Sequence, residues 1–331
     1  MRQDALASDT EAISVRRLIG IFLAAVSLCL SAAHAEPIGV KSHPVPLSKE
    51  EPGLVSVGEL RYRGGIELTS NHPDFGGLSG LRVSADGLSL YAITDRGKFL
   101  TARLIYDEMG LLQALTDADL SPLPGVDGTR RESDAEALSE DGSGGWIVAF
   151  EQRHRLSRFS IGHPRVSEIA LPPAVSRLPS NSGIEAFARL QDGRWLILSE
   201  HAVANGTHPG WLHRDGSGWL ELTYLCEPPF APTDAASLPS GDVLVVERAF
   251  HPIGGWGARI VHVDRQQLGA GMAIWGQPLA TIQGPLNVDN FEGLAARPVP
   301  GNTRLCLLSD NNFNFLQRTL LLTFNWPDNR R

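Results

Sequence analysis

Apolar and polar residues alternate in short runs along most of the chain, beginning at Leu54. Val55, Val57, Leu60 and Tyr62 form the first such run. Alternation with a period of two is typical of β-strands that bury one face. After residue 35 the sequence shows no sustained helical period with caps. Glycines and prolines, which number 34 and 22 in the whole chain, interrupt the runs at regular intervals. The pattern predicts an all-β protein built from many short strands.

One short phrase recurs along the chain: an acid, then a small residue, then a large apolar one. Its clearest copies centre on Glu136, Glu185 and Glu292. Two weaker copies fit the same frame, with serine in place of the acid at Ser79 and with the acid of the fourth copy, Asp234, displaced toward the N-terminus. The copies are spaced by roughly fifty residues, and a period of that length indicates a repeat architecture.

Each copy is followed by a turn and then by an apolar run that ends in an acid. Turn dipeptides such as Asp86-Gly87 and Asp141-Gly142 suit tight connections between strands. The acids that end the runs are Asp95, Glu151, Glu200, Glu247 and Asp310. Two interpretations stay open, since acids at strand ends can be merely solvated or can be gathered at one place for a function.

The repeats have room for four strands each. In the first repeat these span residues 78–84, 88–94, 99–106 and 111–120, whereas the last repeat supplies only three. We expect the N-terminal run at residues 55–68 to complete the last sheet, because closure hides two edges that would otherwise pair with other chains. The prediction is a β-propeller closed by its N-terminal strand, with five blades, or six if the long connections hide another.

The first 35 residues have the features of an export signal. Arg16 and Arg17 precede an apolar run at residues 18–30, and Ala33-His34-Ala35 offers a small-x-small cleavage site. The run is short for a permanent membrane span, and the paired arginines leave twin-arginine export open. We predict a periplasmic or secreted bacterial protein with a lead-in at residues 36–53 and one domain at residues 54–331.

The formal net charge is -8. A negative field repels phosphate, which argues against nucleic acid or an anionic membrane as a partner and is compatible with cation binding. Cys226 and Cys306 remain after the signal and fall in repeats that are not neighbours. We expect a monomer with two buried thiols, and a disulfide is the alternative in an oxidising compartment.

The predicted fold places most of these acids together. In a propeller the first strand of each blade lines the channel and the second runs antiparallel beside it, so the start of one lies level with the end of the other. Carboxylates crowded at one mouth must take up protons or bind cations. Oxygen ligands favour Ca²⁺ over Zn²⁺, for which the sequence has no cluster of cysteine and histidine. The predicted metal ligands are Asp95, Asp134, Glu136, Glu151, Glu185, Glu200, Asp234, Glu247, Asp289, Glu292 and Asp310.

Basic residues accompany the acids in the loops at this mouth. Arg96, His201 and Arg248 each come directly after an acid that ends a second strand. A metal site bordered by such groups suits a small anionic substrate, which the metal polarises and the basic side chains hold. The alternative is that these residues only neutralise the acids beside them.

Several phrases together resemble the phytase-like family of exported bacterial proteins, also described as esterase-like phytases. They are Phe75-Gly76-Gly77-Leu78-Ser79-Gly80-Leu81, Thr94-Asp95-Arg96-Gly97, Asp134-Ala135-Glu136-Ala137-Leu138, Gly183-Ile184-Glu185-Ala186-Phe187, Asp289-Asn290-Phe291-Glu292-Gly293-Leu294 and Leu308-Ser309-Asp310-Asn311-Asn312. The resemblance runs from about residue 54 to residue 324. It implies a propeller related in architecture to the calcium-dependent alkaline phytases, which hydrolyse phosphomonoesters at an acidic, calcium-loaded channel mouth.

Other catalytic signatures are incomplete in the sequence. The run Gly77-Leu78-Ser79-Gly80-Leu81 lacks the final glycine of a nucleophile elbow, and no glycine-rich phosphate loop opens a helix. We therefore expect a hydrolase that acts on a phosphomonoester or related ester through activated water. Its expected catalytic residues are Glu136, Glu185 and Glu292 as metal or water ligands, and Arg96, His201 and Arg248 as anion ligands. Two alternatives stay open: a metal-dependent sugar lactonase, and a non-catalytic scaffold whose calcium only neutralises the channel.

Overall fold

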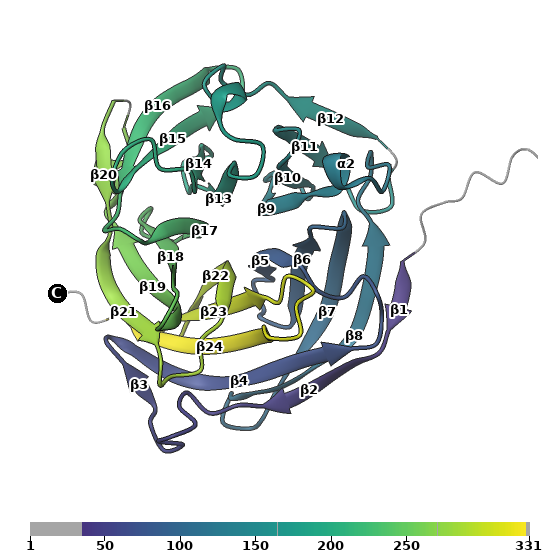
Figure 1. The fold of residues 1–331 in the computed structure, drawn as a ribbon, viewed down its shortest axis with the longest axis vertical. Coiled ribbons are helices and arrows are strands. Elements are labelled where there is room, and N and C mark those ends of the chain that lie inside the picture. The colour runs from purple at the N-terminus through teal and green to yellow at the C-terminus, as the bar shows by residue number, and fades with distance from the viewer. Residues whose placement is uncertain (1–34, 164, 270, 329–331) are drawn as a thin grey trace, which may run out of the picture. The chain divides into compact units, whose positions relative to one another are not determined.

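The structure is a computed structural model that describes residues 35–328, except residues 164 and 270. Residues 1–34 of the predicted export signal lie outside the described residues. The described chain forms five sheets arranged as blades around a central axis, which we call the channel axis (Figure 1). The prediction of an all-β propeller with five blades is confirmed. Among the described residues, helical structure consists of α2 (Arg130–Ser133) and the 3-10 helices η1 (Val175–Arg177) and η2 (Arg265–Gln267), and no helix there is long and apolar enough to cross a membrane.

The blades follow one another in chain order, and the strands of each blade are named from the channel outward. Blade one contains β5 (Leu78–Val83), β6 (Ser89–Thr94), β7 (Lys98–Tyr106), β8 (Leu112–Pro122) and β1 (Glu36–Ile38). Blade two contains β9 (Ala135–Glu140), β10 (Trp146–Phe150), β11 (Arg155–Phe159) and β12 (Val166–Ile169). Blade three contains β13 (Ile184–Arg189), β14 (Trp195–Ser199), β15 (Thr207–Arg214), β16 (Gly218–Leu225) and β20 (Ala273–Trp275). Blade four contains β17 (Ala231–Ser237), β18 (Val243–His251), β19 (Gly255–Val263) and β21 (Gln277–Gln283). Blade five contains β22 (Asn290–Val299), β23 (Asn302–Asp310), β24 (Thr319–Pro327), β4 (Leu60–Ser70) and β2 (Val40–Pro44), with β3 (Ser56–Val57) also paired to β4.

The ring is closed by strands from the N-terminal part of the domain. β4 pairs antiparallel with β24 and so completes the last blade, as predicted. The predicted boundary at residue 54 needs correction, because residues of the supposed lead-in form β1 and β2. β1 pairs with β8 in blade one, and β2 pairs with β4 in blade five. Outer strands present unpaired N–H and C=O groups, and the lead-in satisfies them on both blades.

The core consists of five apolar clusters, each between two neighbouring blades. Between blades four and five, for example, Val246 and Ile260 pack with Leu307 and Phe324. Alternating side chains of a strand face opposite sides of a blade, so an inner strand such as β14 contributes to two clusters. Packing between blades therefore holds the inner strands at fixed positions around the channel.

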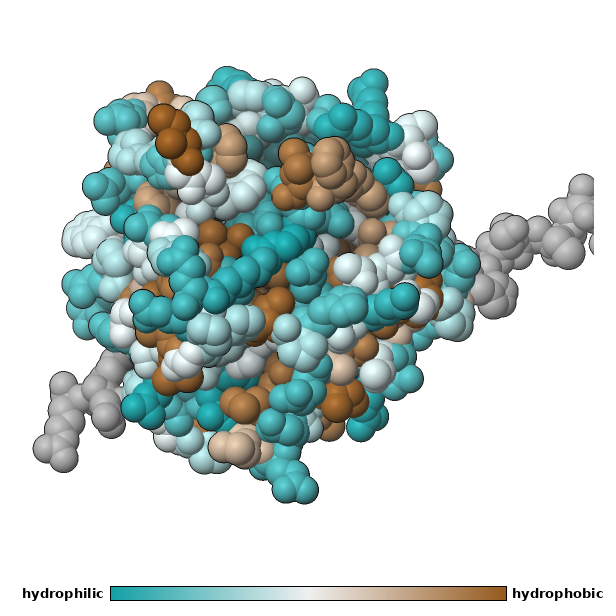
Figure 2. All heavy atoms as spheres, turned by 60° about the horizontal axis from the view of Figure 1, so that its bottom comes forward, coloured by the Kyte–Doolittle hydropathy of each residue, from teal (hydrophilic) through white to brown (hydrophobic). Residues whose placement is uncertain are grey.

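The surface drawn in Figure 2 is largely hydrophilic, with apolar side chains in separate small patches. Scattered apolar groups of this kind are usual on soluble domains. Cys226 is partly buried and Cys306 is buried, and both are free thiols. Two buried thiols were expected, and the structure has two thiols of which only Cys306 is buried.

Candidate metal centre at the channel mouth

The recurring acid lies at the same backbone irregularity in three blades. In β9, Glu136 is an extra residue opposite the step from Phe150 to Ala149 in β10. Glu185 has the same place in β13, and so does Glu292 in β22. A bulge leaves its extra residue unpaired in the ladder and re-aims the side chain. The recurring phrase therefore marks a bulge that directs a carboxylate toward the channel mouth.

Blade four carries different side chains at the equivalent places. The bulge in β17 falls at Thr233, one residue before Asp234. In each of these blades, the second strand has one residue that pairs with the residue just before the bulge. In blades two, three and five an acid follows that paired residue. In blade four Glu247 is itself paired with Pro232, so the residue that follows is Arg248. A shift of one residue turns a side chain to the other face of a strand. The structure thus corrects the sequence alignment and does not bring Asp234 and Glu247 to the mouth.

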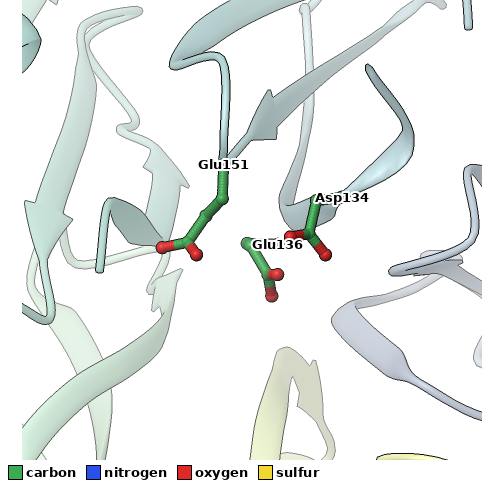
Figure 3. A group of neighbouring side chains, drawn as sticks. All are labelled: Asp134, Glu136 and Glu151. Atoms are coloured by element: carbon green, nitrogen blue, oxygen red, sulfur yellow. The ribbon is translucent and has the colours of Figure 1, made fainter. Parts of the chain in front are cut away.

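Two groups of three carboxylates lie at the mouth and share one member. One oxygen from each of Asp134, Glu136 and Glu151 lies within 4.8 Å of the other two, and the same holds for Glu151, Glu185 and Glu200. In Figure 3 the carboxyl ends of the first group face a common space, with Glu136 between the other two. The mouth cluster, as we call it, consists of Asp95, Asp134, Glu136, Glu151, Glu185, Glu200, Glu292 and Asp310.

Burial and mutual repulsion raise the pKa of most carboxyls in the mouth cluster. Burial is the main reason that the pKa of Glu151 is raised to about 8. Burial and the charge of a neighbouring aspartate raise the pKa of Asp95 to about 7. Burial, with nearby carboxylates adding to it, raises the pKa of Glu136, Glu185 and Asp310 well above its ordinary value. Carboxyls that titrate near neutral pH can exchange protons there or lose them to a cation.

Arg248 brings one positive charge into the mouth cluster. Its Nη2 donates to Glu200 Oε2 at 3.0 Å, and its Nη1 donates to Asn290 Oδ1 at 2.8 Å and to Glu292. Glu292 also accepts from Asn290 Nδ2 at 2.9 Å and from Ser79 Oγ at 3.1 Å. These contacts oppose the effect of burial, which still raises the pKa of Glu292.

Glu185 differs sharply from Glu292. The residue is 7% exposed, and its carboxylate makes no hydrogen bond or salt bridge with any residue that the structure describes. A buried carboxylate without a partner is costly when ionised. A proton or a cation would therefore stabilise the Glu185 carboxyl.

The Asp95 carboxylate packs against the backbone of Gly77. Gly77 has φ +57°, and a Cβ atom there would lie 2.1 Å from Asp95 Oδ1. The same oxygen is buried and has no hydrogen-bond partner in the described chain. The glycine is therefore required both by the backbone conformation and by the position of this carboxylate.

An ion pair fills the channel axis below the mouth cluster. Arg82 Nη1 lies 3.1 Å from Asp234 Oδ2, which also accepts from the Leu294 backbone N–H at 2.7 Å. The Arg82 guanidinium donates further to the carbonyls of Phe187 and Ala235. Burial raises the pKa of Asp234 to about 6, although Arg82 opposes this. The pair ties together the inner strands of several blades, which gives Asp234 a structural role.

Two other predicted ligands also pair with their own arginines outside the mouth cluster. Glu247 Oε2 lies 2.7 Å from Arg259, and the Tyr224 hydroxyl donates to the same carboxylate. Asp289 Oδ2 lies 3.5 Å from Arg318 Nε and accepts from its backbone N–H at 3.0 Å. Charges that are compensated in this way are poor candidates for metal ligands.

The two remaining predicted anion ligands make other contacts. The Arg96 guanidinium lies 3.5 Å from the centre of the Phe313 ring and donates to the Pro73 carbonyl at 2.6 Å. The backbone N–H of His201 donates to Ser199 Oγ, and its side chain is partly buried beside Glu200 in the sequence. Of the three predicted basic residues, the structure brings only Arg248 into hydrogen-bond contact with the mouth cluster.

A family model described as "Phytase-like: Esterase-like activity of phytase" matches residues 73–313, which contain the whole mouth cluster. The chain belongs to the phytase-like family. The expected family is therefore confirmed, and its description names an esterase-like activity.

Comparison with solved structures gives a weaker likeness. A luciferin-regenerating enzyme is 11% identical to this chain, and the match covers 76% of this chain and 92% of that one with a TM-score of 0.42. A search of curated protein sequences gave no match. The inference of function therefore depends on the family and on the site.

Proposed function

We propose that this phytase-like propeller is a hydrolase that acts on a phosphomonoester or related ester at the mouth cluster. It depends on a divalent cation, for which Ca²⁺ is the first candidate. The observation that carries the proposal is the pair of three-carboxylate groups that share Glu151. The family description names an esterase-like activity. If water is the nucleophile of such a reaction, carboxylates are needed to bind a cation or to activate the water. A small anionic substrate, a monomer and export to the periplasm or beyond are part of the same proposal.

The donor set fits such a cation. Calcium takes about 6 to 8 oxygen ligands at flexible geometry, and the mouth cluster offers carboxylate oxygens only. The partnerless Glu185 and the free Oδ1 of Asp95 are oxygens with no other function in the described chain. Glu151 would be shared by two cation positions, with Asp134 and Glu136 on one side and Glu185 and Glu200 on the other.

When bound, the cation would supply a more acidic water and polarise the ester oxygen. The chain's own residues supply the other functions. Arg248 lies between Glu200 and Glu292, where its guanidinium can hold an anionic group and balance its charge. Burial raises the pKa of Glu136 and of Glu185, so each would hold a proton until a cation displaces it. Arg96 and His201 remain part of the proposal as further contacts to the anion.

The test is a hydrolysis screen on the purified mature chain with calcium, with chelator, and with calcium restored. The panel contains aryl and alkyl phosphates, carboxylic esters and sugar lactones. The proposal predicts turnover of a phosphate or carboxylic ester that chelator abolishes and calcium restores. Glu185→Gln should lower this turnover at least about a hundredfold, whereas Glu140→Gln, an exposed acid at the far end of β9, should leave it unchanged.

Two results would contradict the proposal. Turnover of lactones alone would identify a lactonase. Calcium binding with no hydrolysis across the panel would identify a non-catalytic propeller whose calcium neutralises the channel.

A further inference from the structure

A hollow lies beside the mouth cluster, between blades three and four. Its volume is about 550 Å³, which is within the range of small-molecule sites. Its walls come from the loop after β14, including Ala202 and Ala204, and from the segment before β17, including Pro228, Pro229 and Phe230. Glu200 lines the same hollow.

The hollow and the mouth cluster share Glu200. This residue belongs to the second carboxylate group and accepts from Arg248 Nη2 at 3.0 Å. On the opposite wall, Ala231 is the strand partner of Arg248. An ester whose anionic group is held at Arg248 would therefore extend its organic portion into this hollow.

The lining is unsuited to a polyanion. Among the described lining residues there is no lysine or arginine, and the carboxylate of Glu200 repels anions. His208 also lines the hollow, but it is buried and its ring nitrogen Nδ1 lies 3.2 Å from the Ser199 carbonyl, so that nitrogen is engaged with the backbone.

The apolar wall is also firmly held. Arg259 lies over the Phe230 ring at 4.4 Å, and its charge is balanced by Glu247 at 2.7 Å and Glu227 at 3.1 Å. The ring and the two prolines offer a rigid apolar surface, which binds a flat or compact apolar group at little cost in side-chain entropy.

We infer that this hollow is the subsite for a compact apolar portion of the substrate, so that the substrate is an ester with one anionic group and one ring-sized apolar group rather than a polyphosphorylated polyol. The inference rests on the proposed function for the position of the anionic group. It names Ala204 and Phe230 as residues that determine specificity.

Binding and hydrolysis are measured separately so that the subsite and the reaction can fail independently. The binding probes are 1-naphthylmethylphosphonate and methylphosphonate, followed by ligand-observed NMR with the calcium-loaded mature chain. The parent should bind the naphthyl probe at least about tenfold more tightly than the methyl probe. Ala204→Trp fills the hollow and should remove that preference while leaving methylphosphonate binding within about twofold.

Val203→Trp is the matched control, because Val203 is 62% exposed on the same loop and does not line the hollow. It should keep the naphthyl preference. Ala202→Trp is a second filling variant, and a melting curve for each variant confirms folding. In the hydrolysis experiment, 1-naphthyl phosphate should be a better substrate than inositol hexakisphosphate for the parent and for Val203→Trp. The two filling variants should lose this preference.

Four outcomes decide the inference. Selective naphthyl binding that both filling variants remove, without hydrolysis of any ester, supports the subsite and overturns the proposed reaction. Equal binding of the two phosphonates, or equal effects of Ala204→Trp and Val203→Trp, overturns the subsite. Preferred hydrolysis of inositol hexakisphosphate overturns it as well.

Discussion

Glu151 is the residue whose replacement tests the mouth cluster most broadly, because it belongs to both carboxylate groups. It is 5% exposed, and its carboxylate accepts the backbone N–H of Gly183. Glu151→Gln keeps the shape of the side chain and an oxygen for that hydrogen bond, and it removes the charge. The variant should therefore separate the cost of the charge from the loss of a ligand.

The magnitude follows from the pKa of Glu151, which is raised in the folded chain from an ordinary value of 4.5 to about 8. The folded state therefore holds this proton more tightly than the unfolded state. The corresponding stability is present below pH about 4.5 and is lost as the pH rises through 8. At about 1.4 kcal/mol per unit, the loss for this one group is at most about 5 kcal/mol.

Urea unfolding at pH 5 and at pH 9 measures this directly. In chelator, Glu151→Gln should match the parent within about 1 kcal/mol at pH 5 and should be more stable by about 2 to 5 kcal/mol at pH 9. In calcium at pH 9 the order should reverse, since the parent gains binding energy that the variant lacks. The exposed Glu140→Gln variant should change stability by less than about 0.5 kcal/mol throughout.

The reasoning would be refuted by equal stability of parent and Glu151→Gln in chelator at both pH values. An equal gain from calcium in both proteins would also refute it, because Glu151 would then be no ligand.

Further predictions concern closure, the channel, the anion and export. Deleting residues 60–70 removes β4 and exposes the edge of β24, so gel filtration should show aggregation; a monomer with an unchanged melting temperature would contradict the closing role. Arg82→Met should lower the free energy of unfolding by about 3 to 5 kcal/mol, because it leaves the buried Asp234 uncompensated, and adding Asp234→Asn should restore much of the loss; failure of that rescue in urea titrations would count against the pair. Arg248→Met should lower kcat/KM for the ester at least about tenfold more than Arg96→Met, and equal effects would contradict the placement of the anion at Arg248. Mass spectrometry of exported protein should find an N-terminus near Glu36, and an intact N-terminus or a lipid on Cys29 would count against a start at that position.

The fold could be predicted because its signals are local and repeated. Alternation over a few residues predicts a strand, turn dipeptides such as Asp86-Gly87 predict the connections, and the recurring phrase predicts the blades. The need for a closing strand follows from the missing strand of the last repeat. By contrast, nothing local in residues 36–53 shows that an outer edge will pair with them, so β1 and β2 were not predictable from pattern.

The site residues could be predicted only for blades in which the strand register agrees with the sequence alignment of the repeats. In blades two, three and five one acid is the bulge residue and a second acid has the same position relative to the bulge on the neighbouring strand. The structure brings these acids together. In blade four a shift of one residue places Thr233 and Arg248 where the other blades have acids. The displaced position of Asp234 in the fourth copy of the phrase indicated that the register differs in this blade. The structural role of Arg82 could also have been suspected, because it is a charged residue at an inner-strand position where the other repeats have uncharged or apolar residues. Its partner Asp234 could not be predicted, since it is distant in sequence.

The central claim is that buried carboxyls with raised pKa values give up their protons to a divalent cation at the mouth cluster. Calorimetric titration of the chelator-treated mature chain with Ca²⁺, repeated in buffers of different ionisation enthalpy, measures binding and proton release together. With the pKa of Asp95 raised to about 7 and that of Glu151 to about 8, calcium binding should release protons at pH 7 and almost none at about pH 9.5. Absence of binding, or binding at pH 7 without proton release, would contradict the claim.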